Sequence, residues 1–157
     1  MDPTLTPRYA TPADTPEIVR LREVMWTSMG LPVAEDGWRE RCADVVDRWL
    51  RTDVAGAAVV EHPERDALVA CGIGSIDQRL PGSANPSGRY GYIANMVTET
   101  DFRGRGLAGG ILRLLLAWYE AQGVRTVDLH ASPQGEAIYR THGFAENAQT
   151  ALRWRAP

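Results

Sequence analysis

The segment Arg103-Gly104-Arg105-Gly106-Leu107-Ala108-Gly109-Gly110 runs directly into the most regular apolar helical pattern of this chain. Glycines let main-chain N–H groups approach a ligand without side-chain obstruction, and a helix that begins here leaves its first N–H groups unpaired. The positive end of the helix dipole lies at the same place, which favours a phosphate or pyrophosphate. Glycine-rich turns also occur as plain helix starts, so this segment alone predicts either an anion site or an ordinary connection.

The chain contains no lysine, and all 17 of its basic residues are arginine. A Walker-type P-loop needs a lysine for the β- and γ-phosphates of a nucleotide. A pyridoxal enzyme needs a lysine for its Schiff base. Both classes are therefore excluded, and any phosphate at the glycine segment 103–110 is bound in another way.

The composition is that of a globular protein. A chain of 157 residues fits a single domain, 1–157, that buries about two-thirds of the surface its unfolded form exposes. The hydrophobic content of 44% is ordinary for a globular protein. The net charge of -3 gives no overall attraction to nucleic acid or to an anionic membrane. We therefore expect neither as a partner.

Two further features indicate the compartment. The N-terminal residues Met1–Pro7 lack the charged and apolar regions of a signal peptide, and no window approaches the roughly 18 apolar residues of a membrane span. Cys42 and Cys71 have no CxxC partner and lie in apolar segments, as buried thiols of a reducing compartment do. We expect a cytoplasmic protein.

Apolar periodicity predicts the elements on both sides of the glycine segment. Before it, the expected elements are helices at 11–29 and 36–51, a hairpin of strands Gly56–Glu61 and Ala67–Ile76, and a strand Tyr90–Thr98. After it, we expect a helix at 107–122, a strand Val124–Ala131, a short helix Pro133–His142 and a final strand Ala148–Trp154. Strands and helices alternate from residue 90 onward, which predicts an α/β layer structure with crossover connections.

Two motifs in this order resemble the GNAT superfamily of N-acetyltransferases. The first is the family's [Q/R]-x-x-G-x-[G/A] pattern, filled by Arg103, Gly106 and Ala108. The second is a polar residue seven positions before a tyrosine that is followed by Gly-Phe, filled by Ser132, Tyr139, Gly143 and Phe144. Many members have asparagine where this chain has Ser132. The resemblance covers residues 85–145, with the expected helix and strand between the motifs.

The resemblance implies a fold and a cofactor. The fold is a mixed, mostly antiparallel sheet of six to seven strands, with splayed fourth and fifth strands and about four flanking helices. The cofactor is acetyl-CoA, with its pyrophosphate on the main-chain N–H groups of the glycine segment and its pantetheine arm paired like a missing strand with a bulged fourth strand. The implied cofactor-binding residues are Asn95, Met96, Val97, Thr98, Arg103, Gly104, Arg105, Gly106, Leu107, Ala108, Gly109, Gly110 and Ser132.

The resemblance also implies the chemistry. The hydroxyl of Tyr139 acts as general acid toward the leaving thiolate of CoA, and a main-chain N–H near Val97 stabilises the oxyanion. An alkylamine is mostly protonated at neutral pH, so a base must take its proton. Glu99, Glu23 and His130 are candidates for this base, although a residue in each of these places is more often a surface or structural residue than a base.

The aromatic residues Trp26 and Trp38 form the wall of an acceptor pocket or belong to the core. The histidines are scattered and have no neighbours at ligand spacing, so we expect no metal.

The resulting expectation is an acetyl-CoA-dependent N-acetyltransferase that acts on a primary amine of a small molecule or a protein by direct attack in a ternary complex. The alternative is a non-catalytic acyl-CoA-binding regulatory domain. An exposed C-terminal strand would permit a homodimer.

Overall fold

A mixed sheet forms the centre of the fold, with its strands in the order β1-β2-β3-β4-β5. The computed structural model describes residues 5–157, so the first four residues of the segment Met1–Pro7 lie outside the described part. The strands are β1 (Arg8–Tyr9), β2 (Ala55–Glu61), β3 (Leu68–Gln78), β4 (Arg89–Thr98) and β5 (Val127–Leu129). The helices are α1 (Thr15–Ser28), α2 (Trp38–Leu50), α3 (Leu107–Ala121) and α4 (Glu136–Thr141), with short 3-10 turns η1 (Pro12–Asp14) and η2 (Thr100–Phe102).

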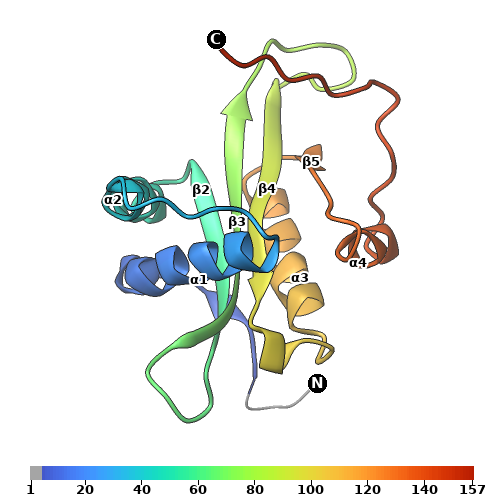
Figure 1. Ribbon diagram of the computed structural model, residues 1–157. Helices are drawn as coiled ribbons and strands as arrows, with labels where there is room; N and C mark the ends of the chain where they lie inside the picture. The colour runs from blue at the N-terminus through green and yellow to red at the C-terminus, as the bar shows by residue number, and fades with distance from the viewer. Residues whose placement is uncertain (1–4) are drawn as a thin grey trace.

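The strands β1 to β4 pair antiparallel, whereas β4 and β5 pair parallel because α3 connects them as a crossover. Figure 1 shows α1 and α2 on one face of the sheet and α3 on the other. Each face has its own apolar core. Leu21 and Val59 belong to the cluster under α1 and α2, while Ile111 and Leu115 belong to the cluster under α3. This arrangement confirms the predicted mixed, mostly antiparallel fold with about four helices.

Glycines in the sheet let α3 approach closely. A Cβ added at Gly74 would lie 2.4 Å from the hydroxyl oxygen of Tyr119, and one added at Gly91 would lie 2.5 Å from its ring. The hydroxyl of Tyr119 donates to the carbonyls of Ser75 and Tyr92 at 3.1 and 2.9 Å. Tyr119 therefore ties α3 to the paired ends of β3 and β4, and burial raises the pKa of its hydroxyl.

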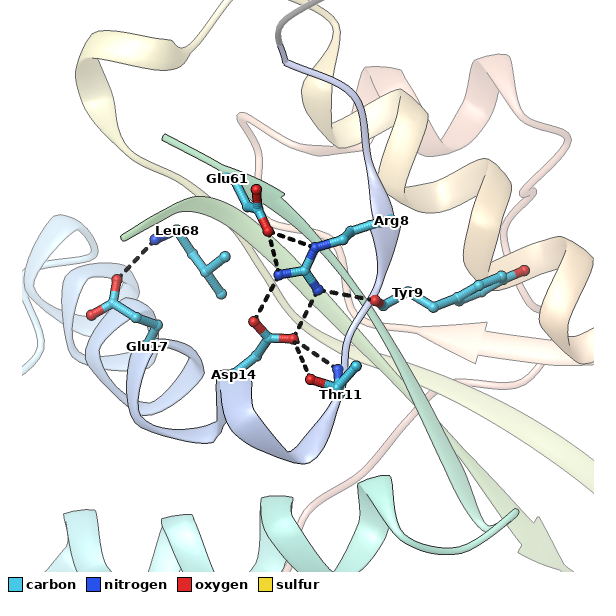
Figure 2. A network of polar contacts seen from close by, with 7 residues as sticks. All are labelled: Arg8, Tyr9, Thr11, Asp14, Glu17, Glu61 and Leu68. Carbon is cyan, nitrogen blue, oxygen red and sulfur yellow. Dashed lines mark hydrogen bonds and ion pairs between the residues drawn. The ribbon is translucent and has the colours of Figure 1, made fainter. Parts of the chain in front are cut away.

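The N-terminal segment is fixed by Arg8 (Figure 2). Its guanidinium donates to both carboxylate oxygens of Asp14 at 2.9 Å and to Glu61 of β2 at 2.8 Å. Asp14 in turn accepts a hydrogen bond from the main-chain N–H of Thr11 at 2.7 Å. Burial tends to raise the pKa of the Asp14 carboxyl, but the hydrogen bonds from Arg8 and Thr11 outweigh it and the pKa is lowered. The network joins β1, β2 and the start of α1.

The prediction of six to seven strands is wrong, since the described residues form five. The expected final strand Ala148–Trp154 has no regular structure. Its alternating pattern needs a neighbouring strand to bury the apolar side, and here Leu152 and Trp154 are 92% and 81% exposed. Figure 1 shows this C-terminal segment leaving α4 and running back along the outside of the molecule.

Two further elements are shorter than predicted, and one was not predicted. The strand expected at Val124–Ala131 is reduced to β5, because the N–H of Val124 still bonds to the end of α3. The helix expected at Pro133–His142 begins at Glu136, because Gly135 and Glu136 first form a turn on the carbonyl of Ser132. The strand β1 has only two residues, too few for a recognisable alternation.

Candidate active site

Residues 103–106 of the glycine segment form an exposed turn, and residues 107–110 are the first turn of α3. Gly104 and Gly106 have φ angles of +74° and +78°, which favour glycine, and nothing lies within 4 Å of a Cβ added at either. The helix starts at Gly106 without a side-chain cap. The N–H groups of its first turn are therefore available to a ligand, which is the arrangement that binds phosphate.

Two arginines flank this turn. The side chain of Arg103 donates to the carbonyl of Thr98 at 3.1 Å, and that of Arg105 donates to the carbonyl of Asp101 at 3.0 Å. The guanidinium of Arg105 also lies 5.0 Å from the ring centre of Phe102. Each guanidinium has donors left over for phosphate oxygens, because these contacts use only part of its fork.

The sheet opens next to the turn. β4 pairs with β5 only at Gly91–Ile93 and then continues without a partner on that side. A bulge lies directly beyond, where Gly72 of β3 faces both Asn95 and Met96 of β4. Asn95 has a φ of +55°, the sole positive φ of a non-glycine among residues 5–157. β5 ends at Leu129, the partner of Ile93, so no strand within residues 5–157 pairs with the bulge or the rest of β4 on that side, and we call this unpaired edge the gap.

Beyond the bulge, every second residue of β4 directs its main-chain N–H and C=O groups toward this gap. The N–H of Glu99 donates to Val69 of β3 at 2.8 Å. Because polar groups alternate in direction along an antiparallel strand, the N–H and C=O groups of Thr98 and Met96 point the other way, toward the gap. The contact from Arg103 to the carbonyl of Thr98 agrees with this direction.

Tyr139 lies on α4 beside the end of β5. It is 9% exposed and packs edge-on against Phe144, with ring centres 5.9 Å apart. Its hydroxyl donates to no residue within 5–157, and burial raises the pKa of this hydroxyl. It lines a pocket of about 270 Å³ formed by Val127, Asp128, Leu129, Ala131, Glu136, Tyr139, Arg140, Phe144, Ala145, Glu146 and Asn147. The hydroxyl is thus kept protonated over the neutral pH range and free to donate.

Ser132 lies in the turn before α4. It is exposed, and its hydroxyl accepts a hydrogen bond from the N–H of Gly135 at 3.2 Å. The side chain therefore fixes the turn that leads into the helix of Tyr139.

The two candidate glutamates are both held by arginines. Glu23 binds Arg39 at 2.7 Å, and this hydrogen bond lowers the pKa of Glu23. Glu99 binds Arg20 at 2.7 Å. The carboxylate of Glu23 is a weaker base because protonation must break its ion pair, and the carboxylate of Glu99 is occupied by Arg20.

The third candidate, His130, has a different partner. Its Nδ1 lies 2.6 Å from the hydroxyl oxygen of Tyr92, and the two rings are 5.8 Å apart. Tyr92 pairs with Ser75 of β3. Ser75 lies two residues from Ile73 and so faces the same side of the sheet, and Ile73 packs under α1 and α2. The pair therefore lies on the α1/α2 face of the sheet, at the end of β5 where the gap begins.

The tryptophans lie together. Trp26 of α1 and Trp38 of α2 have ring centres 4.7 Å apart, and both are half-buried. Arg22, one turn before Trp26, lies with its guanidinium 4.6 Å from that ring. No sequence pattern singles out Arg22, since it is one arginine among 17 and only its spacing of four residues from Trp26 relates the two.

Neither cysteine has the properties of a nucleophile. Both are free thiols, and burial raises the pKa of Cys71 to about 12 and also raises that of Cys42. Among residues 5–157 there is no group of three side chains suited to hold a metal ion. Within the same residues, no helix is long and apolar enough to cross a membrane.

The spacing Gly104-x-Gly106-x-x-Gly109 also fits the glycine pattern of dinucleotide-binding proteins. That pattern belongs to a sheet of parallel strands, whereas β1 to β4 are antiparallel here. The fold and the site instead define an α/β protein with a glycine-lined helix start that suits a phosphate group, beside the unpaired edge of β4.

The sequence model of the acetyltransferase (GNAT) family matches residues 18–144, and the chain belongs to this family. The match includes both the glycine segment and Tyr139. It confirms the resemblance of the two motifs and makes the chain an acyltransferase of the N-acetyltransferase type. Comparison with curated proteins gives no match.

Solved structures with the same fold agree with this assignment. A predicted acetyltransferase from Clostridium acetobutylicum, determined with acetyl-CoA, has a TM-score of 0.85 and 24% identity over 95% of both chains. A GCN5-related N-acetyltransferase from Ralstonia eutropha JMP134 has a TM-score of 0.75 and 20% identity over 96% of this chain and 98% of its own. A glucosamine-6-phosphate N-acetyltransferase from Arabidopsis thaliana has a TM-score of 0.74 and 17% identity over 96% of this chain and 97% of its own.

Proposed function

We propose that this protein transfers the acetyl group of acetyl-CoA to a primary amine by direct attack in a ternary complex. The observation that carries the proposal is the combination of an uncapped, glycine-lined start of α3 with the gap that opens between β4 and β5 beside it. The turn suits a pyrophosphate, and the free main-chain edge of β4 suits the amide groups of a pantetheine arm. The family of the chain has this cofactor chemistry.

The residues of the turn bind and orient the cofactor in this proposal. The N–H groups of 104–109 hold the pyrophosphate, since that of Gly110 already donates to the carbonyl of Gly106, and Arg103 and Arg105 add charged contacts to its oxygens. Main-chain groups of Met96–Thr98 pair with the arm and supply an N–H donor for the charge that develops on the acetyl oxygen. Acetyl-CoA, when bound, supplies an activated thioester whose thiolate is a fair leaving group.

Tyr139 and His130 move the protons. The amine nitrogen bonds to the acetyl carbon while the carbon–sulfur bond breaks, and the hydroxyl of Tyr139 gives its proton to the departing sulfur. His130 takes the proton that the amine must lose. With a hydrogen on Nδ1 donated to Tyr92, the other ring nitrogen of His130 keeps its lone pair free. We prefer His130 to Glu23 and Glu99 because arginines already hold those carboxylates.

The experiment is release of free thiol from acetyl-CoA across a panel of primary amines, with acetylated product identified by mass. His130→Gln is expected to lower turnover about tenfold or more, with Glu23→Gln and Glu99→Gln as controls that change it less. A larger loss in either glutamate variant would assign the base to that residue. Binding of acetyl-CoA without thiol release for every amine would contradict the proposal and favour a regulatory domain.

A further inference from the structure

An opening lies in the sheet on the α1/α2 face of β4. Ala94 is exposed although it lies in mid-strand, between the buried Ile93 and Asn95. Ala94 pairs with Ile73, whose side chain packs under α1 and α2, so Ala94 faces the same side. The helices therefore leave Ala94 uncovered, one residue beyond the last position of β4 that pairs with β5. Arg22 of α1 reaches the edge of this opening through its contact with Asn95.

Arg22 is held in a fixed position at this edge. Its Nη1 donates to the side-chain oxygen of Asn95 at 3.1 Å, and its guanidinium lies 4.6 Å from the ring centre of Trp26. Stacking on an indole face orients the planar group and leaves its remaining N–H donors directed sideways. The side chain is half-buried.

The charge of Arg22 has no carboxylate partner within residues 5–157, in contrast to the charges of the half-buried Arg8, Arg20 and Arg39. Arg8 binds Asp14 and Glu61, Arg20 binds Glu17 and Glu99, and Arg39 binds Glu23 and Glu35. No carboxylate forms an ion pair with Arg22 among the described residues. A partly desolvated guanidinium whose fork is unfilled has the geometry to receive a carboxylate or a phosphate.

The position of Asn95 on β4 also supports a binding role for Arg22. It is 5% exposed, and its side-chain nitrogen lies 3.5 Å from the sulfur of Cys71, which orients its oxygen toward Arg22. Its positive φ is a strained conformation for a residue with a side chain, and such strain is concentrated at functional sites. The residue that forms the bulge therefore also positions the guanidinium beside it.

We propose that Arg22 binds an acidic group on the amine acceptor, so that the acceptor is a small primary amine bearing a carboxylate or a phosphate. This inference rests on the proposed function. The acidic group lies in the fork of Arg22, beside Trp26, while the amine reaches across Ala94 toward the gap. Arg22 is thus a residue that determines specificity, and Asn95 is a positioning residue.

The test compares acceptors in matched pairs that differ only in the acidic group: glycine with glycinamide, β-alanine with β-alaninamide, and 2-aminoethyl phosphate with ethanolamine. Thiol release is measured with the wild type, Arg22→Gln and a control, Arg48→Gln, which removes an exposed arginine of α2. We expect Arg22→Gln to raise KM for the acidic member of at least one pair by about 10- to 100-fold, with KM for its neutral partner unchanged. The pair that responds identifies carboxylate or phosphate.

A ratio of acidic to neutral KM that is the same in wild type and Arg22→Gln would overturn the inference and leave the proposed function standing. Absence of thiol release with every amine would instead refute the proposed function. In that case calorimetric titration of glycine, β-alanine and 2-aminoethyl phosphate into the CoA-saturated protein decides about Arg22. Weaker binding to Arg22→Gln than to Arg48→Gln supports it, and equal affinity of the two variants overturns it.

Discussion

Substitution of Gly106 by alanine tests the cofactor loop against a control at the other end of the same helix. Gly106 precedes α3 with a φ of +78°, and Gly123 follows it with a φ of +72°. A Cβ added at either position meets nothing within 4 Å, so neither alanine collides with the protein. The two variants therefore carry nearly the same backbone strain, and only Gly106 lies at the proposed pyrophosphate.

The expected magnitudes separate the two effects. A left-handed conformation costs a residue with a Cβ about 1–2 kcal/mol, so both variants should lose a similar free energy of unfolding. The methyl group at Gly106 also occupies the space in front of the first N–H groups of α3. Loss of one charged hydrogen bond to a phosphate costs about 1.5–3 kcal/mol, which raises the Kd for CoA about 10- to 100-fold.

The assay is calorimetric titration of CoA into each folded variant, together with denaturant unfolding of each. Gly106→Ala should bind CoA at least about tenfold more weakly than Gly123→Ala, at equal stability. Equal Kd values for the two variants would refute the assignment of the glycine segment as the cofactor loop.

Three other variants test the remaining parts of the account. Tyr139→Phe should lower kcat about 10- to 1000-fold with little change in CoA affinity, and wild-type turnover of this variant would exclude the acid role of Tyr139. The control Tyr119→Phe loses the hydrogen bonds to Ser75 and Tyr92, so it should lower the free energy of unfolding by about 1 kcal/mol and leave kcat unchanged. Asp14→Asn should lower the free energy of unfolding by about 1–3 kcal/mol at neutral pH. Because folding lowers the pKa of Asp14, this difference from wild type should persist above about pH 4 and vanish as the pH falls through the folded pKa, and a difference that does not change with pH would contradict this. As a control, Asp47→Asn, which removes the ion pair with Arg51 on the surface of α2, should have no measurable effect. We also propose a homodimer through the C-terminal segment, so Trp154→Ala should shift the mass measured by light scattering toward the monomer, and a wild type that is monomeric at all concentrations would argue against it.

The sequence predicted the central part of the fold because the signals there are local. The hairpin of β2 and β3, the strand β4 and the long helix α3 each have a regular apolar period and clear boundaries. The glycine segment could be placed before α3 from its residues alone. Its ligand could not, since the same residues fit a phosphate loop, a plain helix start and even a dinucleotide pattern. Only the second motif at Tyr139 favoured one of these.

The C-terminal strand was mispredicted for a different reason. Leu152 and Trp154 alternate with arginines as in a strand, but a strand also needs a partner edge, and no local pattern reveals whether one is available. In the structure this segment stays unpaired, and both side chains remain exposed.

The acceptor side of the site was hidden because it depends on tertiary contacts. The ion pairs that hold Glu23 and Glu99 join residues far apart in the chain or on different helices. The opening at Ala94 exists because one extra residue in β4 bends the strand, and the contact between Arg22 and Asn95 spans 73 positions. Periodicity describes each element separately and contains no information on such pairs.

The most direct test of the central claim is a crystal structure of the protein with acetyl-CoA. The account predicts that the pyrophosphate lies within hydrogen-bond distance of the N–H groups of 104–109, that the arm pairs with the main chain of Met96 and Thr98 in the gap beside β4, and that the thioester sulfur faces the hydroxyl of Tyr139. A cofactor bound away from this gap, or a sulfur that Tyr139 does not reach, would contradict it.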